Sequence, residues 1–376
     1  MHGTRGRPVR ISSGEELAQR LDAAPAAQVD AATWQVSGVD LAPLADRLLG
    51  QRLEGTTFLG CPGDDDLLTA LRAAGALVLP VPAGVPLDPD RRELYTPAEL
   101  YDGPEYPAYP ETLDARVYAW TQQPRDRDAT RVAALHDHGI DEALRAWAAP
   151  RRLVGVMGGH AAERGTPGYR EAALLGAAVA RTGAVVATGG GPGAMEAASL
   201  GARLGSLDET DAAARLDDVL AHLAPVPSFR PSIEAWAVAG RAARAALDDV
   251  PPGPGVVGIP TWFYGHEPPH VMADVVAKYV SNAVREAVLV ELCTAGIVVL
   301  PGAAGTVQEI FQDACEGYYS SGDTADVPPL VLLGREYWTR TLPAWPLLEA
   351  LGRGRAFGER IAVVDTIAEA IAVLTR

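Results

Sequence analysis

Two stretches of this chain join a short apolar run to a helical pattern through a glycine-rich turn. AVVATGGGPGAMEA runs from Ala184 to Ala197, and IVVLPGAAGTVQE runs from Ile297 to Glu309. Short apolar runs between helices are typical of a parallel sheet that is buried on both faces. Ligands of such sheets bind at the turns that follow the carboxyl ends of the strands. The two stretches therefore predict a Rossmann-like α/β domain that holds an anion.

The turns suit a phosphate for a physical reason. The first amides of a helix have no partner within the helix and carry about half a positive charge. Glycines remove the Cβ atoms that would hold an anion away from those amides. The predicted phosphate- and ribose-binding residues are Gly189, Gly190, Gly191, Gly193, Glu196, Gly302, Ala303, Ala304, Gly305 and Thr306.

The same alternation continues outward from both turns and predicts one large domain over residues 131–376. Its expected strands are Leu153–Met157, Ala184–Ala187, Val256–Ile259, Ile297–Leu300, Leu330–Leu333 and Ile361–Val364. Its expected helices are Arg131–Ala148, Tyr169–Thr182, Ala194–Arg203, Ser281–Ala295, Thr306–Tyr318, Tyr337–Leu351 and Ile367–Leu374, with residues 208–250 mostly helical. We therefore expect a parallel sheet with helices on both faces.

Two further regions precede that domain. Residues 1–82 predict a smaller α/β domain, with helices at Glu15–Leu21, Leu41–Leu49 and Asp65–Ala74 and strands at Trp34–Val39, Thr57–Leu59 and Ala76–Val81. Residues 83–130 are rich in proline and tyrosine and predict a linker or covering arm, because prolines interrupt long helices. No catalytic motif lies in residues 1–82.

Composition excludes several classes of function. The net charge is −16, with 32 basic and 48 acidic residues, so nucleic acid and anionic membranes are unfavourable partners. The three cysteines show no paired or metal-ligand spacing, which favours a reducing cytoplasm. Residues 1–10 lack the apolar core of a signal peptide, and no apolar run is long enough to span a membrane. We expect a cytoplasmic protein.

The acidic residues of the two turns have two interpretations. Thr306 and Glu309 have the spacing of a capping box, in which the glutamate returns to the N-cap amide. Spacing alone favours that role. The alternative is a carboxylate beside a ribose, where it stabilises an oxocarbenium-like transition state. Glu196 lies in the first turn of a helix, where any acid is favoured, or it contacts a ribose or base.

Taken together, the motifs resemble the LONELY GUY (LOG) family of nucleoside 5′-monophosphate phosphoribohydrolases. The resemblance rests on Gly189–Gly193 followed by Met195-Glu196-Ala197-Ala198, and on Pro301-Gly302-x-x-Gly305-Thr306-x-x-Glu309. Val154–Gly159 is similar to the first strand of the family and its turn. The resemblance covers about residues 153–375, with residues 208–250 as an insertion.

The resemblance implies a catalytic pair, Arg285 and Glu309, and no metal or redox cofactor. It also implies a homodimer or higher homo-oligomer. Two positions depart from the family pattern. Ala303 stands where the family has a second glycine, and Glu286 stands where it has a lysine beside the arginine. The first departure narrows the approach to a phosphate, and the second reverses a charge near the site.

The segment that follows Val256–Ile259 holds further candidates. His266-Glu267-Pro268-Pro269-His270 has the letters of a zinc-protease motif, but consecutive prolines disrupt the helix that such a motif needs. Trp262, Tyr264 and His266 are candidates for contact with a nucleobase, and a proline-rich turn that packs its own aromatic side chains is the alternative. His160, Arg164 and Tyr169 follow the first strand. They either line the same pocket or, for His160 and Arg164, are exposed loop residues.

The sequence thus predicts hydrolysis of the N-glycosidic bond of a nucleoside 5′-monophosphate, which gives free base and ribose 5-phosphate. The main alternative is a non-catalytic nucleotide- or cofactor-binding carrier. A decarboxylase that uses pyridoxal phosphate needs a Schiff-base lysine, and the only lysine, Lys278, lies in no such motif. The sequence leaves open which base is preferred.

Overall fold

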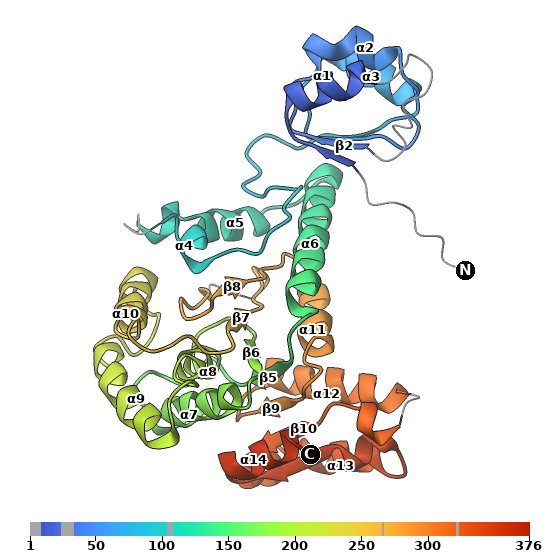
Figure 1. Cartoon of the computed structure of the whole chain (residues 1–376). Coiled ribbons are helices and arrows are strands. Elements are labelled where there is room, and N and C mark those ends of the chain that lie inside the picture. Colours follow the sequence, from blue (N-terminus) through green and yellow to red (C-terminus); the bar gives the residue numbers. More distant parts are fainter. Residues whose placement is uncertain (1–8, 24–33, 104–107, 265–266, 321–322) are drawn as a thin grey trace. The chain divides into compact units, whose positions relative to one another are not determined.

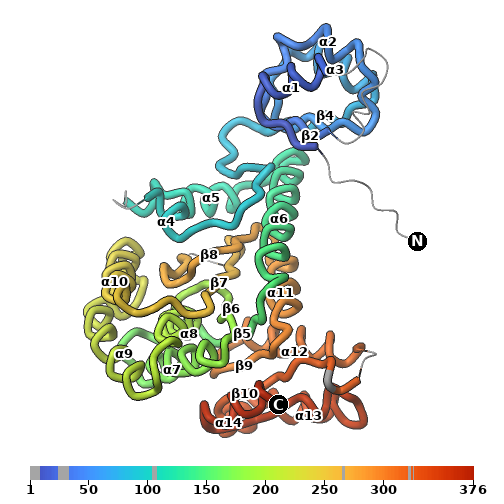
Figure 2. Tube along the Cα trace, viewed as in Figure 1, coloured from blue at the N-terminus to red at the C-terminus, as the bar shows by residue number. Residues whose placement is uncertain are grey.

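The computed structural model of the chain describes residues 9–23, 34–103, 108–264, 267–320 and 323–376. The chain divides into two compact units (Figures 1 and 2). The first contains Met1–Arg91 and Gln123–His136, and the second contains Arg92–Gln122 and Asp137–Arg376. Each unit has its own parallel sheet, so the chain is an α/β protein in both parts.

The sheet of the first unit has four parallel strands in the order β1-β2-β3-β4. The strands are β1 (Val9–Ile11), β2 (Trp34–Ser37), β3 (Thr57–Leu59) and β4 (Leu77–Leu79). The helices are α1 (Gly14–Asp22), α2 (Ala45–Leu49), which a 3₁₀ turn at Ala42–Leu44 precedes, and α3 (Asp65–Ala73). Right-handed crossovers between consecutive strands place these helices on one face, as Figure 1 shows. Their apolar sides bury Ile11, Val36 and Phe58.

The sheet of the second unit has seven parallel strands in the order β11-β10-β9-β5-β6-β7-β8. The strands are β5 (Leu153–Met157), β6 (Val185–Thr188), β7 (Val256–Gly258), β8 (Val275–Val276), β9 (Ile297–Val299), β10 (Leu330–Leu333) and β11 (Ile361–Val364). All but the outer strands β8 and β11 are fully buried, as strands covered by helices on both faces must be. This is a Rossmann-like arrangement.

Helices cover both faces of this sheet. Those of the second unit are α4 (Pro97–Leu100), α5 (Leu113–Thr121), α7 (Pro167–Arg181), α8 (Ala194–Ala202), α9 (Glu209–Leu223), α10 (Ile233–Ala245), α11 (Asn282–Glu291), α12 (Ala304–Tyr319), α13 (Trp345–Gly352) and α14 (Ile367–Leu374). Helix α6 (Arg127–Ala148) has residues in both units. α7 packs against α8 and α14, whereas α12 packs against α11 and α13. None of the helices in the described ranges is long and apolar enough to cross a bilayer.

The order of the strands reverses beside β5. The chain proceeds from β5 outward through β6 and β7, then returns to β9, which pairs with β5 on its other side. Figure 2 shows these two strands side by side although more than a hundred residues separate them in sequence. A ligand of an open α/β sheet binds outside the carboxyl ends of the strands at such a switch point. The turns after β5 and β9 are therefore the expected ligand site.

Most expected elements are confirmed within two or three residues at each end. The expected helix at Tyr337–Leu351 is wrong: a π-helical turn at Tyr337–Thr341 ends before Pro343, and α13 begins at Trp345. Pro343 has no amide hydrogen to donate and clashes with the preceding turn, so one continuous helix cannot form. Strands β1 and β8 were not expected, because two or three residues carry no periodic signal. Helix α5 was not expected either, because it lies in the region whose prolines predicted a linker or covering arm.

Candidate functional site

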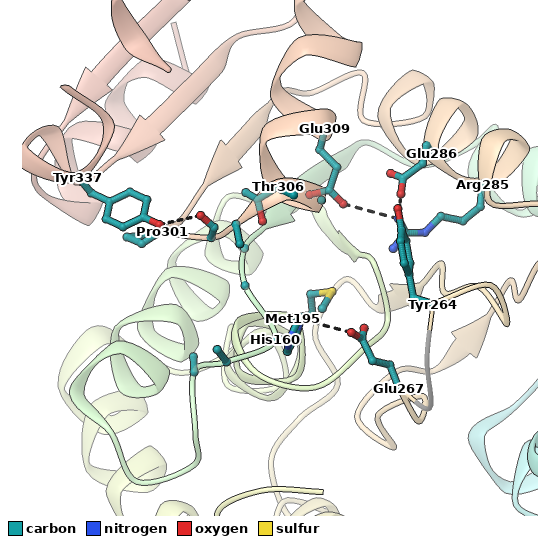
Figure 3. A pocket seen from close by; sticks show the side chains of 18 residues that line it. His160, Met195, Tyr264, Glu267, Arg285, Glu286, Pro301, Thr306, Glu309 and Tyr337 are labelled. Carbon is teal, nitrogen blue, oxygen red and sulfur yellow. Dashed lines mark hydrogen bonds and ion pairs between the residues drawn. The ribbon is translucent and has the colours of Figure 1, made fainter. Parts of the chain in front are cut away.

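A cavity of about 530 Å³ lies at the carboxyl ends of β5 and β9 (Figure 3). The turn after β5 contributes residues 158–162 to its wall, and the turn after β9 contributes residues 301–306. The remaining wall residues are Met195, Tyr264, Glu267, Arg285, Glu286, Glu309 and Tyr337. The cavity thus occupies the switch point of the strand order and brings together Arg285, Glu309 and the second glycine-rich turn.

The turn at Gly302–Thr306 opens into this cavity. Helix α12 begins at Ala304, and no side chain caps its first amides. Ala303, Ala304 and Gly305 are exposed, so these amides face the cavity with the positive end of a sixteen-residue helix behind them. Tyr337 fixes the turn, because its hydroxyl donates a hydrogen bond of 2.7 Å to the Gly302 carbonyl. This turn has the properties of an anion site.

Glycine is required at position 302 but not at position 303. A Cβ atom at Gly302 would lie 2.1 Å from the Thr306 hydroxyl and 3.0 Å from the Gly159 amide nitrogen. Ala303 has φ −107°, outside the positive range that favours glycine. The φ angle at this position therefore does not require the expected second glycine.

The first glycine-rich turn, Gly189–Gly193, is buried and packs against protein atoms. Gly190 has φ +73°, and a Cβ there would lie 2.6 Å from Pro260. Gly193 has φ +76°, and a Cβ there would lie 2.6 Å from the Gly159 carbonyl oxygen. The Ala194 amide, the first of α8, donates to that same carbonyl at 3.1 Å. None of Gly189, Gly190, Gly191 and Gly193 belongs to the cavity wall.

Arg285 extends from α11 to the base of this first turn. Its Nε donates to the Ile259 carbonyl at 2.7 Å, and its Nη2 donates to the Gly189 carbonyl at 3.3 Å. A Cβ at Gly189 would lie 2.5 Å from that Nη2, so only glycine leaves room for the guanidinium. The first glycine-rich turn therefore helps to hold the Arg285 guanidinium in place.

Glu309 faces the cavity from the second turn of α12. One of its carboxylate oxygens lies 3.8 Å from Arg285 Nη1. Burial raises the pKa of Glu309 to about 7, against the lowering effect of Arg285, and the charge of Glu286 raises it further. The side chain is thus divided between its two protonation states near neutral pH.

The capping-box role of Glu309, which its spacing favoured, is wrong. Helix α12 begins two residues before Thr306, so Thr306 lies within the first turn of the helix and is not its N-cap. The N-cap is Ala303, which has no side-chain acceptor. Glu309 is left without a helix end to cap and is available to the cavity.

Glu286, also in α11, is the second buried carboxylate of the wall. Its side chain is 3% exposed, and its Oε1 lies 2.7 Å from Arg285 Nη1. Its Oε2 is buried and has no hydrogen-bond partner among the described residues. Arg285 thus lies between two carboxylates, with Glu286 much the closer of the two.

Glu196 lies outside the cavity wall and forms a buried ion pair. Its oxygens accept from Arg164 Nε at 3.0 Å and from Arg164 Nη2 at 2.5 Å, and both side chains are 1% exposed. Arg164 also donates to the Trp236 carbonyl at 3.1 Å and lies over the Trp236 ring. The interpretation of Arg164 as an exposed loop residue is therefore wrong. Its neighbour His160 is exposed and does line the cavity.

The three base-contact candidates have different surroundings. Tyr264 lines the cavity. Trp262 is buried and donates its indole N–H to Asp114 at 2.8 Å, as a packed side chain would. His266 lies outside the described residues.

His270, the last residue of the segment that has the zinc-protease pattern, is buried beside the first glycine-rich turn. Its Nδ1 accepts from the Met272 amide at 3.2 Å, and its Nε2 lies 3.0 Å from the Ser199 hydroxyl. Burial lowers its pKa to about 3, so the ring is neutral, with both nitrogens engaged. No group of three metal-ligand side chains is found in the described parts of the chain.

Several wall residues were not predicted as binding residues. In the turn after β5, His160 was a pocket candidate because it follows the first strand, and its neighbours Ala161 and Ala162 could have been found from the same position. Met195 belongs to the Met195-Glu196-Ala197-Ala198 motif and Glu267 to the zinc-protease-like segment, but neither was predicted to line the site, and Tyr337 lies in no motif. Glu267 is paired with His160 at 3.3 Å, and both side chains line the cavity (Figure 3).

Comparison with known proteins gives one family and several structures. The model of the SLOG cluster4 family matches residues 151–206, which span β5, α7, β6 and α8. No curated protein matches the sequence. The resemblance to the LOG family rests on the quoted motifs and remains a prediction.

Two of the matching solved structures have molybdenum cofactor proteins as their subjects. The molybdenum cofactor binding protein from the phototrophic bacterium Rippkaea orientalis is 19% identical, with a TM-score of 0.36, over 60% of this chain and 96% of that one. The Moco carrier protein from Chlamydomonas reinhardtii is 18% identical, with a TM-score of 0.35, over 60% and 96%.

Proposed function

We propose that this protein binds a nucleoside 5′-monophosphate in the cavity and hydrolyses its N-glycosidic bond to free base and ribose 5-phosphate. The observation that carries the proposal is Glu309, a carboxyl group with a pKa near 7 in the wall of the same cavity as the open amides of α12. A phosphate site and a titrating carboxylate in one enclosure are what this reaction requires.

The phosphate would bind the amides of residues 304–306. They are uncapped and backed by the dipole of α12, and Ala304 and Gly305 are exposed. A volume of about 530 Å³ falls within the usual range of small-molecule sites. The net charge of −16 does not oppose this, because local amides act at contact distance whereas distant surface charges are screened by salt.

Glu309 would act at the anomeric carbon. In the ionised state it stabilises the positive charge that develops on the ribose ring as the bond to the base breaks. A water oxygen forms the new bond to C1′, the bonding pair leaves with the base nitrogen, and the base gains a proton. The water loses one proton to Glu309, which releases it to solvent, and solvent supplies the proton that the base gains. Arg285, 3.8 Å away, would hold Glu309 in position and limit the rise of its pKa.

Incubation of the full chain with AMP, GMP, CMP and UMP, followed by chromatography for free base, tests the proposal. We expect base and ribose 5-phosphate in equal amounts. Because Glu309 must be ionised, the rate should rise through about pH 7. Glu309→Gln should abolish base release.

Asp313→Asn is the matched control. Asp313 lies one turn later in α12, and burial raises its pKa to about 7 as well, but it does not line the cavity. Its replacement should leave both the rate and the pH profile unchanged. Full turnover by Glu309→Gln would remove the assignment of the catalytic carboxylate.

A non-catalytic carrier is the second candidate, and the contacts of Arg285 favour it. The guanidinium is already held by two backbone carbonyls and by Glu286, so fewer of its donors remain for a substrate than in an open arginine site. AMP binding in calorimetry without base release from any of the four nucleotides would support the carrier.

A further inference from the structure

The partnerless oxygen of Glu286 carries information about the ligand. The carboxylate is buried in the cavity wall, and its Oε1 is occupied by Arg285 at 2.7 Å. Its Oε2 has no donor among the described residues. A buried carboxylate oxygen without a donor is costly, so such an oxygen needs a hydrogen bond from water, an ion or a ligand.

The order of groups along the cavity indicates which part of a nucleotide reaches Glu286. Figure 3 shows the Pro301–Thr306 turn with Tyr337 at one end, and Arg285, Glu286 and Tyr264 at the other, with Glu309 between them. A nucleoside monophosphate has phosphate, ribose and base in the same order. With the phosphate on the amides of α12 and the ribose at Glu309, the base lies at Tyr264 and Glu286.

We infer that Glu286 selects nucleotides whose base carries an exocyclic amino group, such as adenine or cytosine, over those with a carbonyl oxygen at that position. This rests on the proposed binding of a nucleoside monophosphate. An ionised carboxylate accepts hydrogen bonds and donates none. It therefore pairs with an amino group, whereas the carbonyl oxygen of hypoxanthine or uracil repels it. The ring of Tyr264 supplies an aromatic surface for the base at the same end.

The salt bridge to Arg285 makes this discrimination rigid. A carboxylate fixed through Oε1 cannot rotate away from a mismatched base. The repulsion between its Oε2 and the carbonyl oxygen of hypoxanthine or uracil is therefore not relieved. A lysine at position 286, as in the family that the motifs resemble, would donate hydrogen bonds instead and favour carbonyl oxygens.

Calorimetry on the full-length Glu309→Gln protein, which is arrested before hydrolysis, tests the inference. Dissociation constants are measured for two matched pairs, AMP with IMP and CMP with UMP. We expect the amino member of each pair to bind roughly tenfold or more tightly, the usual effect of a hydrogen bond to a charged group. Adding Glu286→Gln should bring both ratios close to one, because an amide can either donate or accept.

Glu267→Gln, added to the same background, is the control. Glu267 is also a carboxylate of the cavity wall, but its oxygen is paired with His160 at 3.3 Å. Its replacement should leave both ratios unchanged, which shows that the readout does not depend on the total charge of the cavity.

The outcomes separate the inference from the function on which it rests. Equal binding within each pair, or ratios that survive Glu286→Gln, overturn the role of Glu286 while nucleotide binding itself stands. No binding of any of the four nucleotides overturns the proposed function and the inference together. If Glu286→Gln does not fold, the two ratios in the parent protein decide the question alone.

Discussion

The two glycine-rich turns of this protein have similar sequences and opposite surroundings. Gly189–Gly193 is buried, and its glycines lie against Pro260, Gly159 and Arg285. In the Gly302–Thr306 turn, residues 303–305 are exposed to a cavity, and Gly305 has no atom within 4 Å of the position of a Cβ. The first turn uses glycine to bring protein segments together, and the second uses it to shape a place for a ligand. A glycine-rich turn after a strand is therefore ambiguous until its neighbours are known.

The largest expected effect on stability concerns the glutamates that follow the two turns. Glu196 neutralises Arg164 in a buried pair, so Glu196→Gln should lower the free energy of unfolding by roughly 3–5 kcal/mol, the cost of a buried charge that loses its partner. Urea unfolding measures it. Replacing both members, as in Arg164→Met with Glu196→Gln, should recover part of the loss. An unchanged unfolding midpoint for Glu196→Gln would show that the pair is not structural.

The next test places a methyl group in the closed turn. Gly193→Ala forces a Cβ to within 2.6 Å of the Gly159 carbonyl at φ +76°, where non-glycine residues are strained. We expect a loss of roughly 2–4 kcal/mol in unfolding free energy. Thermal unfolding monitored by circular dichroism measures it. A variant as stable as the parent would mean that this turn is as open as the other.

Glu309→Gln should have the opposite sign to Glu196→Gln. In the unfolded chain this carboxyl group ionises near pH 4.5, but in the folded chain it ionises near pH 7. The folded state therefore binds the proton more tightly, and the contribution of Glu309 to stability falls as the pH rises from 4.5 to 7. Glu309→Gln removes that loss, so the variant should be roughly 1–3 kcal/mol more stable than the parent at pH 8.

The pH dependence of the stability gained in Glu309→Gln tests whether ionisation causes it. Below about pH 4.5 both the folded and the unfolded carboxyl groups are protonated, so parent and Glu309→Gln should have equal stability there. Urea unfolding at pH 4 and pH 8 measures the difference. A gain of the same size at both pH values would assign it to packing and not to ionisation.

The smallest effect on stability is expected in the open turn. Gly305→Asp adds a carboxylate to the first turn of α12, where the helix dipole favours it, so stability should change by less than about 1 kcal/mol. The same carboxylate would occupy the phosphate position and repel a phosphate. We expect AMP binding to be lost in calorimetry while the unfolding midpoint is retained. Undiminished AMP binding would place the phosphate elsewhere.

Much of the site follows from sequence patterns. Arg285, Glu309 and residues 302–306 line one cavity, whereas Gly189–Gly193 and Glu196 do not, and the roles of all these residues remain predictions. The first residue of α12 could not be predicted from the sequence, because capping depends on backbone angles at Ala303 that no residue type dictates. The buried partner of Glu196 did not follow either. Arg164 lies 32 residues away, in a loop without periodicity, and only packing brings the two together.

By itself, the sequence determined the class of fold and the position of most strands and helices, because alternation of apolar runs and helical patterns is local information. It also named the arginine and the glutamate of the site. Only the tertiary structure decided which glycine-rich turn is open. β9 pairs with β5 on the side opposite β6, so the cavity forms between the turns after β5 and β9, and the turn after β6 is covered. Strand order is a property of the whole sheet, and no single segment encodes it.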